Sequence, residues 1–312
     1  MVLIGDESPE RIRRHVLSGD LVVFAPTPGS LALADWTRRC LESAFDPLDP
    51  RLAQHSLSVD RYIEILAAVK PAFVHSEESW RHVVDFLGDV GLGTDDIFLD
   101  VPRVRVSPSD DYLTVGVAHR QPPHRDTWWG SPFQQLNFWG PVYPMTPENG
   151  MTFYPSYWDR PLANSSDEFN LYEWNVTGRV NAADEKGGTD KRGMPEPSEE
   201  VDEPGLSISL PVGGMLCFSG AHLHATRPHA TGSARASVDF RAISVLDVEA
   251  ELGPGNIDSK QMGTALRDFR QLDSLVGLDA GLIERFENTV VPEGGAVVFA
   301  APEIDGDVLP DP

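Results

Sequence analysis

The pattern of apolar residues changes character near residue 100. Before that point, long segments carry apolar side chains at helical spacing, most clearly within 30–45, 59–74 and 78–92. Beyond it come short runs rich in β-branched and aromatic residues, separated by Gly, Pro and Asn. Short strands with turn signals between them predict an all-β barrel or a double-sheet jelly roll. The runs are 101–108, 111–121, 133–143, 150–158, 205–212, 214–220 and 234–246.

We therefore expect a single domain over residues 1–312 that is mainly β, with flanking helices. Its first part should be mainly helical and pack on the barrel. Its middle part should be the jelly-roll core, and its last part should hold further helices and a tail. The three parts are expected at 1–100, 101–250 and 251–312.

The sequence also predicts local features within these three parts. A polar stretch at 159–205, rich in Pro, Gly and charge, interrupts the core, and we call it the insertion. A loop of this length is either a lid over the barrel mouth or a solvated excursion. Asn149-Gly150 predicts a hairpin turn. Helices are expected at 259–272 and 279–291, followed by a loose tail at 304–312.

The charge of the chain excludes some partners. With 25 Lys and Arg against 48 Asp and Glu, the formal net charge is −23. Such a chain repels phosphate backbones and anionic lipid, so neither nucleic acid nor membrane is an expected partner. No secretory signal or long apolar run is visible, and a cytoplasmic location is expected. The expected partner is a small-molecule substrate, and the oligomeric state is not predicted.

The segment "HRD" at 124–126 is the first candidate site. In a strand, residues two apart point to one face, so His124 and Asp126 would lie side by side while Arg125 faces outward. An imidazole beside a carboxylate can supply two ligands of a divalent metal. A surface hydrogen bond is the other reading of the pair.

A third ligand must come from elsewhere, and three histidines follow one apolar strand, namely His222, His224 and His229. Two histidines and one carboxylate form the facial triad of non-haem Fe(II) oxygenases, which leaves positions open for a co-substrate and O2. A structural zinc site would instead be closed by four ligands.

Arg235 lies on the strand that follows these histidines. Polar residues alternate there with Ala236, Val238 and Phe240, which predicts a polar inner face and an apolar outer face. A guanidinium binds a carboxylate bidentately, so an arginine near an Fe(II) triad suggests a dicarboxylate co-substrate. A salt bridge to Asp239, or to an acidic residue of the insertion, is the alternative.

These residues carry a family resemblance. The segments 124–126, 146–158 and 213–241 resemble the phytanoyl-CoA hydroxylase-like branch of the Fe(II)/2-oxoglutarate-dependent dioxygenases. The resemblance implies a double-stranded β-helix, the cupin-like jelly roll, with Fe(II), 2-oxoglutarate and O2. It implies that His224 is the third ligand, because the family's 2-oxoglutarate-binding Arg lies eleven residues past the distal histidine, here at Arg235.

The resemblance extends to further positions. It implies that Thr226 helps to hold the far carboxylate of 2-oxoglutarate and that Trp139 lies against this co-substrate, although Trp139 can also be a core aromatic. Trp128 and Trp129 can line the substrate pocket or simply pack. Many relatives have Asn where this chain has His229, so the chain departs from the family pattern at this position.

The expected reaction follows from Asp126. Related halogenases replace this carboxylate with a small residue, so Asp126 favours oxygen chemistry. Hydroxylation of a C–H bond in a polar small molecule or natural-product intermediate is expected, with release of succinate and CO2. Desaturation, cyclisation and epimerisation stay open. The rival functions are a metal-dependent cupin enzyme that does not use 2-oxoglutarate and a non-catalytic jelly-roll binding protein.

Overall fold

The larger of two sheets runs through the middle of the protein. The structure is a computed structural model that describes residues 2–3, 7–292 and 308–310. Within these ranges eight strands form one sheet, in which β1 and β2 are parallel and all other pairs are antiparallel. In sheet order the strands are β1 (Val2–Leu3), β2 (Val22–Phe24), β8 (Met215–Ser219), β5 (Leu136–Pro141), β10 (Arg235–Ser244), β3 (Ile97–Leu99) and β11 (Arg270–Gln271), and β4 (Arg103–Ser107) pairs with β10.

The smaller sheet carries the histidine region. It has the order β7–β6–β9 and is antiparallel throughout. A single bridge between His124 and His224 adds the "HRD" segment beside β9. Residues a hundred positions apart are therefore neighbours at this edge. The strands are β7 (Leu206–Ile208), β6 (Met151–Phe153) and β9 (His224–Thr226).

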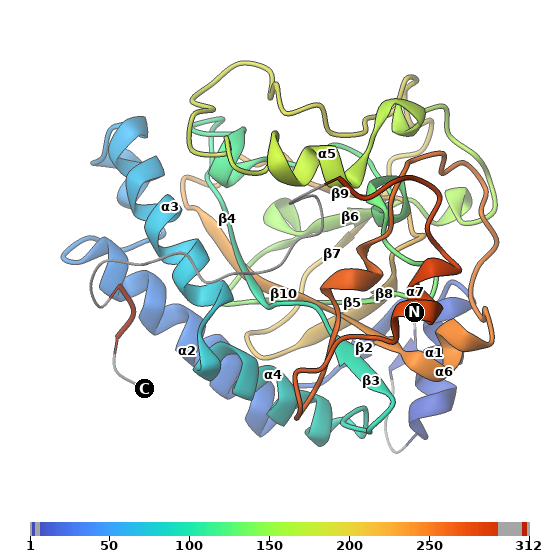
Figure 1. Cartoon of the computed structure of the whole chain (residues 1–312). Helices are drawn as coiled ribbons and strands as arrows, with labels where there is room; N and C mark the ends of the chain where they lie inside the picture. The colour runs from blue at the N-terminus through green and yellow to red at the C-terminus, as the bar shows by residue number, and fades with distance from the viewer. Residues whose placement is uncertain (1, 4–6, 293–307, 311–312) are drawn as a thin grey trace.

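Four helices of the N-terminal part begin at Ser or Thr caps whose side chains accept hydrogen bonds from first-turn amides. Figure 1 shows α2, α3 and α4 together on one side of the larger sheet. The described part of the first hundred residues is mainly helical. These helices are α1 (Pro9–Leu17), α2 (Pro28–Phe45), α3 (Val59–Val74) and α4 (Glu77–Asp89); α5 (Leu171–Val176), α6 (Val245–Glu249) and α7 (Ala280–Glu284) follow later.

Strand β10 has two different faces, as its alternating sequence predicts. Val238 and Phe240 belong to the main apolar core with side chains of α2, α3 and α4. The ring of Phe240 stacks on Phe138 of β5 at 4.8 Å between centroids, and Phe86 of α4 packs edge-on at 6.0 Å. The helices therefore cover the apolar face of the sheet, and its polar face is left for the interior of a cavity.

The expected hairpin at Asn149-Gly150 is wrong. Residues Pro147–Asn149 form a 3-10 turn, and the side chain of Asn149 accepts a hydrogen bond from the Thr146 amide at 3.0 Å. Gly150 is extended with φ −74°, whereas a type I′ turn needs positive φ at both central residues. Strand β6 pairs with β7 and β9 instead.

Three further expectations differ from the structure. Residues 111–121 form no strand but a loop with a 3-10 turn at Gly116, whose φ is +61°. Residues 259–272 form no α-helix, because Met262 exchanges backbone hydrogen bonds with the insertion and Gly263 has φ +89°. The second expected helix is limited to α7. Most of the expected tail, 304–312, lies outside the described residues.

The remaining regular elements are short. Among the described residues, no helix combines the length and apolar character that a membrane crossing needs. The 3-10 turns are η1 (Ala53–His55), η2 (Gly116–Ala118), η3 (Asp126–Trp129), η4 (Pro147–Asn149), η5 (Pro155–Tyr157), η6 (Ser166–Glu168) and η7 (Ala265–Asp268).

Candidate metal centre

His124, Asp126 and His224 meet in the interior. One possible ligand atom from each residue lies within 4.8 Å of the other two, and all three residues are buried. The Oδ1 atom of Asp126 is 3.4 Å from Nε2 of His124 and 3.8 Å from Nε2 of His224. The structure thus brings together the three ligands that the family resemblance implies, and the combination of two imidazoles and one carboxylate fits Fe(II).

The backbone sets the positions of the three side chains. His124 and His224 exchange two N–H···O=C bonds of 2.9 Å, which places their rings 4.3 Å apart between centroids. The chain is extended at Arg125 and enters η3 at Asp126. The carboxylate therefore reaches the histidines from the first residue of a 3-10 turn, and not from a continuing strand.

Both imidazoles are held in the tautomer that a metal needs. Nδ1 of His124 lies 2.8 Å from the carbonyl oxygen of Pro122, and Nδ1 of His224 lies 3.0 Å from that of His222. A carbonyl only accepts, so each Nδ1 carries the proton and each Nε2 presents a lone pair. Nε2 of His124 is buried with no hydrogen-bond partner among the described residues, as expected of a ligand atom.

Asp126 is oriented by neighbours that bind only one of its oxygens. Its Oδ2 accepts hydrogen bonds from Asn137 at 2.8 Å and from Gln135 at 3.3 Å, and Nε of Arg241 lies 3.7 Å away. Oδ1 is left facing the two histidines. The carboxylate is thereby prepared to offer one oxygen to a metal while the protein holds the other.

The electrostatics keep this set in its metal-binding form. Burial opposes the ionised form of Asp126, but the charge of Arg241 holds the pKa of this carboxyl group well below its usual range. Burial, reinforced by the neighbouring His124, lowers the pKa of His224 to about 3. At neutral pH the site therefore offers a carboxylate and, at His224, a neutral imidazole.

The other two candidate histidines have different roles. The ring nitrogens of His222 lie 3.2 Å and 3.1 Å from the carbonyl oxygens of Ser219 and Gly19. Those of His229 lie 3.0 Å from the Thr231 hydroxyl and 3.3 Å from the Ser107 carbonyl. Both residues lie outside the buried three-residue cluster, in agreement with the choice of His224.

Arg125 corrects one expectation. It does face away from the metal cluster, but it points into the protein, with only 2% of its surface exposed. It pairs with Asp258 at 3.1 Å, and it donates hydrogen bonds to the carbonyls of Ala221, Tyr157 and Arg160. A spacer expected at the surface is therefore a buried connection between four segments.

A cavity of about 780 Å³ borders the cluster, and Asp126 and His224 contribute to its wall. Arg235 lines it too, only 6% exposed, and its Nε and Nη1 have no hydrogen-bond partner among the described residues. The alternative, a salt bridge between Arg235 and Asp239, does not form among the described residues. Asp239 pairs with Arg105 instead, at 2.7 Å. The guanidinium carbon of Arg235 lies 5.6 Å from the ring centre of Trp139, and Thr226 lines the same cavity.

The two neighbouring tryptophans have separate surroundings. Trp129 lines the cavity, and its ring lies 5.7 Å from that of His124. Trp128 is fully buried in a different apolar cluster and donates its Nε1 hydrogen to Asp258 at 2.7 Å. The pocket-lining interpretation therefore fits Trp129, and the packing interpretation fits Trp128.

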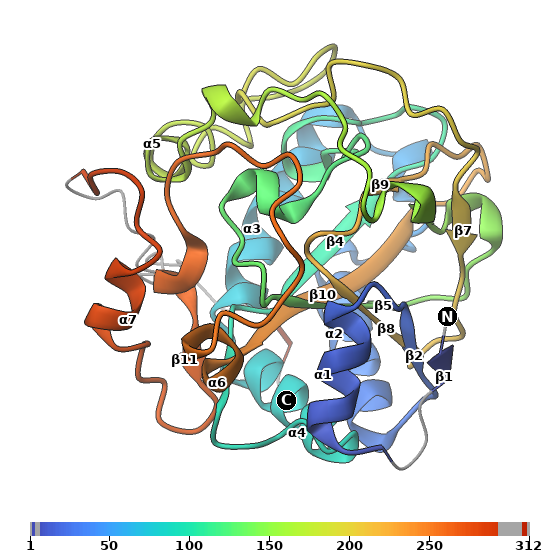
Figure 2. The same ribbon diagram turned by 90° about the vertical axis from the view of Figure 1, so that its right-hand side faces the viewer.

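The insertion contributes to the cavity wall through residues that include Trp174, Arg179 and Met194. Figures 1 and 2 place it across one end of the molecule, far from α4. Asp190 fixes it to the loop at η2, since its carboxylate accepts a hydrogen bond from the Gly116 amide at 2.9 Å and lies 3.1 Å from Nδ1 of His119.

Sequence reasoning missed the residues that hold Asp126. Gln135 and Asn137 are polar and two positions apart; Gln135 directly precedes β5, and Asn137 is its second residue. Because residues two apart share a face, this spacing was an available signal for a buried amide pair. Lys70 was also missed, although a single lysine among the apolar residues of 65–74 is a comparable signal.

No protein-family model and no curated protein matches the chain. Among solved structures, it is similar to EvdO2 from Micromonospora carbonacea var. aurantiaca, at 15% identity over 78% of this chain and 94% of that one, with a TM-score of 0.45. It is also similar to the non-heme monooxygenase ThoJ, at 16% identity over 75% and 77%, with a TM-score of 0.41.

A third similar structure is the non-heme alpha ketoglutarate dependent epimerase SnoN from nogalamycin biosynthesis. It is 14% identical over 76% of this chain and 82% of that one, with a TM-score of 0.38. EvdO2 has also been solved complexed with 2-oxoglutarate. What the chain shares with non-haem iron and 2-oxoglutarate-dependent enzymes is an H-x-D…H triad at His124, Asp126 and His224.

Proposed function

We propose that this protein is an Fe(II)- and 2-oxoglutarate-dependent oxygenase. The observation that carries the proposal is the buried cluster of His124, Asp126 and His224. The protein holds Nδ1 of each histidine and Oδ2 of the aspartate by hydrogen bonds, and the other polar side-chain atom of each residue faces the remaining two. These residues would hold Fe(II). The metal would supply the redox chemistry that couples decarboxylation of 2-oxoglutarate to oxidation of a C–H bond.

Arg235 is the proposed anchor of the co-substrate. The N–H groups of its two unpaired, buried nitrogens are costly unless a ligand accepts from them, and a carboxylate accepts two parallel hydrogen bonds from one guanidinium. Thr226 would add a hydroxyl to the same carboxylate, and Trp139 would flank it. A dicarboxylic 2-oxo acid fits a site with a metal at one end and an arginine at the other.

The proposed reaction is hydroxylation. One substrate C–H bond, 2-oxoglutarate and O2 give one C–OH group, succinate and CO2, which balances in atoms and electrons. Asp126 fills the position that a halide would need. The cavity of about 780 Å³ is of the size that encloses a small organic molecule, such as a natural-product intermediate.

We also infer that the two sheets belong to one jelly roll of the double-stranded β-helix type. His224 belongs to the smaller sheet, whereas Asn137 and Arg241, which approach Asp126, belong to the larger one. A site formed between the sheets is what such a barrel provides. The insertion would then act as a lid, and 1–312 would be a single domain.

The two rival functions make different demands on the same residues. A cupin enzyme without 2-oxoglutarate gives no reason for unpaired hydrogen-bond donors on a buried arginine beside the metal residues. A non-catalytic binding protein gives no reason for His124 and His224 to be held with Nε2 free. Both features favour the oxygenase.

Succinate release tests the proposal. Purified protein with Fe(II), ascorbate, 2-oxoglutarate and O2 should form succinate slowly even without substrate. Arg235→Ala should abolish this signal at low 2-oxoglutarate, whereas Arg285→Ala, which removes an exposed arginine paired with Glu251, should not change it. Metal binding without any succinate from the unchanged protein would favour the cupin alternative.

A further inference from the structure

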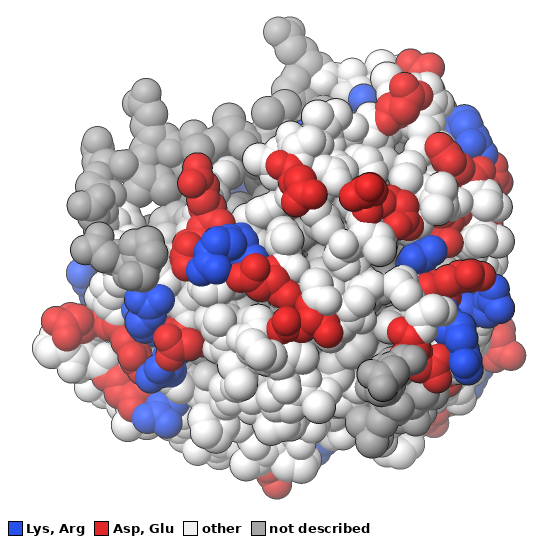
Figure 3. Space-filling view, turned by 90° about the horizontal axis from the view of Figure 1, so that it is seen from below, with Lys and Arg blue, Asp and Glu red and all other residues white. Residues whose placement is uncertain are grey.

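The interior of the cavity has the opposite charge to the chain as a whole. The chain carries a net charge of −23, and the face in Figure 3 has acidic side chains scattered over it, many beside a basic one. The cavity wall, in contrast, includes two acidic residues among those that the structure describes, Asp126 and Asp239. Its basic residues are Lys70, Arg103, Arg105, Arg179, Arg192, Arg235 and Arg241.

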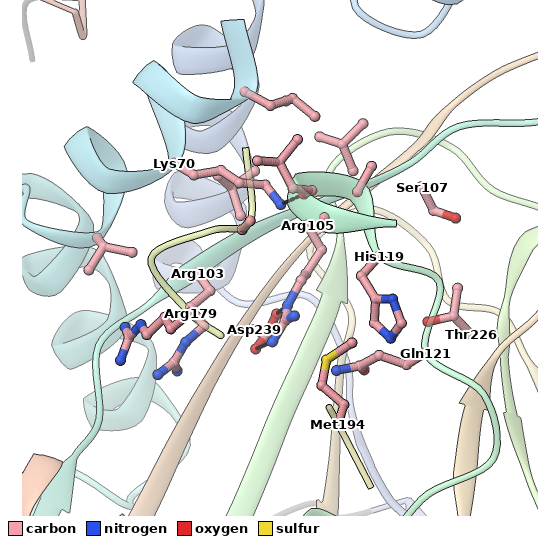
Figure 4. A pocket seen from close by; sticks show the side chains of 18 of the residues that line it. Lys70, Arg103, Arg105, Ser107, His119, Gln121, Arg179, Met194, Thr226 and Asp239 are labelled. Carbon is pink, nitrogen blue, oxygen red and sulfur yellow. Dashed lines mark hydrogen bonds and ion pairs between the residues drawn. The ribbon is translucent and has the colours of Figure 1, made fainter. Parts of the chain in front are cut away.

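Many of these cations come from one ladder. In the antiparallel register, Arg105 of β4 lies opposite Ser237 of β10, and Arg103 lies opposite Asp239. Residues opposite each other in such a pair point to the same face. Figure 4 shows the result, with Arg103, Arg105 and Arg179 gathered around Asp239 on the α3 side of the cavity.

Several of the arginines already have carboxylate partners. Arg103 and Arg241 share Asp100 at 2.7 Å and 3.2 Å, and Arg105 pairs with Asp239. Arg192 pairs with Asp190 at 2.7 Å in the same way. These pairs fix the geometry of the wall, and their carboxylates cancel part of its charge.

Lys70, like Arg235, is a cation that this network does not neutralise. Its Nζ donates a hydrogen bond to the carbonyl of Val117, and no described carboxylate lies within ion-pair distance of it. Burial, together with the nearby charge of Arg105, lowers the pKa of Lys70 to about 7. An ammonium in these surroundings is disfavoured as long as no anion faces it.

We propose that the substrate of this enzyme carries an anionic group, a carboxylate or a phosphate, which binds at Lys70 with Arg105 and Arg179 beside it. This inference rests on the proposed function, because it leaves Arg235 to 2-oxoglutarate. In Figure 4, Lys70 and Thr226 lie on different sides of the cavity, which separates the two anion sites.

The rest of the wall gives the substrate an apolar body. Leu66 and Val74 come from α3, and Trp129 and Trp174 contribute aromatic surface that connects this region to the metal residues. Trp129 and Trp174 lie 6.1 Å apart between ring centres. An organic anion with an apolar part fits this lining better than a sugar or a cation does.

Anaerobic calorimetry with two matched probes tests the site. Octanoate and octanamide share a chain and differ in charge, and octyl phosphate provides the second type of anion. The protein is loaded with Fe(II) and saturating 2-oxoglutarate, so that the site at Arg235 is filled. Octanoate or octyl phosphate should bind more tightly than octanamide, and the stronger anion identifies the headgroup.

Variants assign the binding to Lys70. Lys70→Met should weaken binding of the preferred anion by about tenfold or more, because a charged hydrogen bond is lost, and it should not affect octanamide. Lys70→Arg should restore much of the affinity. The control Lys186→Met removes an exposed lysine paired with Asp60 and should have no effect.

The outcomes separate this proposal from the proposed function. Equal binding of the preferred anion to the unchanged protein and to Lys70→Met overturns the anion site, as does failure of both anions to bind. Loss of 2-oxoglutarate affinity in Lys70→Met would show that Lys70 serves the co-substrate, and this also overturns it. Absence of 2-oxoglutarate binding in the unchanged protein refutes the proposed function alone, because the comparison with Lys70→Met still reports whether the anion binds at Lys70.

Discussion

The two ends of the cavity are built in different ways. At the metal end, His124 and His224 are joined by backbone hydrogen bonds, and their Nδ1 atoms bind carbonyls only two residues away. At the basic end, Lys70 comes from a helix, Arg105 from a strand and Arg179 from the insertion. The metal end is fixed by local backbone, whereas the basic end depends on packing between distant segments.

Because the two ends are built differently, iron binding and substrate selection should respond to different substitutions. Iron binding should respond to a few side chains and little to the insertion. Substrate selection should respond to any change that moves α3 or the insertion.

The largest effect is expected at the third ligand. His224→Ala should lower Fe(II) affinity by more than about 100-fold, because a first ligand contributes more than the 10–100-fold typical of its supporting residues. His222→Ala is the matched control, because His222 is equally buried but bonds only to backbone carbonyls. Anaerobic Fe(II) titration, with circular dichroism to verify folding, is the measurement. The reverse order of the two variants would contradict the assignment.

The next-largest effect is expected on 2-oxoglutarate binding and not on Fe(II) binding. Arg235→Ala should weaken 2-oxoglutarate binding by about 10- to 100-fold, since two charge-assisted hydrogen bonds are lost. Its Fe(II) affinity should remain that of the unchanged protein. A calorimetric titration with 2-oxoglutarate measures this, and an unaltered affinity would show that Arg235 does not bind it.

A smaller effect on Fe(II) affinity is expected at the residues that donate hydrogen bonds to Asp126. Asn137→Ala should lower Fe(II) affinity by about tenfold, in the range found for residues that orient a ligand. Gln135→Ala should do less, because its hydrogen bond to Asp126 is 3.3 Å long and that of Asn137 is 2.8 Å. Both variants can be ranked in one competition assay with a metal chelator. A larger loss in Gln135→Ala would refute this account of how Asp126 is held.

The smallest effect should be local and confined to the insertion. Asp190→Asn weakens the charge-assisted contacts to Gly116, His119 and Arg192. Amide hydrogen exchange in 179–194 should become faster, while exchange in β9 should not change. Equal acceleration in both segments would mean that the two ends of the cavity are not independent.

The metal end could be predicted because its motifs are short and because the family resemblance singled out His224 among three histidines. The H-x-D spacing and the interval from His224 to Arg235 are set by single short segments. The apolar and polar faces of β10 follow from alternation alone. For the same reason, the helices at 30–45, 59–74 and 78–92 could be placed from the spacing of their apolar residues.

What the sequence could not provide depends on distant partners. The buried position of Arg125 depends on Asp258, 133 residues away, so local alternation predicted only that it faces away from the triad. The loop at Gly116 depends on Asp190 of the insertion. The region around Met262 forms hydrogen bonds to the insertion and so does not become the helix that its spacing suggested.

The most direct test of the central claim is the anaerobic visible spectrum of the protein with Fe(II) and 2-oxoglutarate. Chelation of Fe(II) by the 2-oxo acid produces a weak charge-transfer band. The account predicts this band in the unchanged protein and in His222→Ala, and its absence in His224→Ala. A band that persists in His224→Ala, or that never forms in the unchanged protein, would contradict the claim that the triad is an Fe(II)/2-oxoglutarate centre.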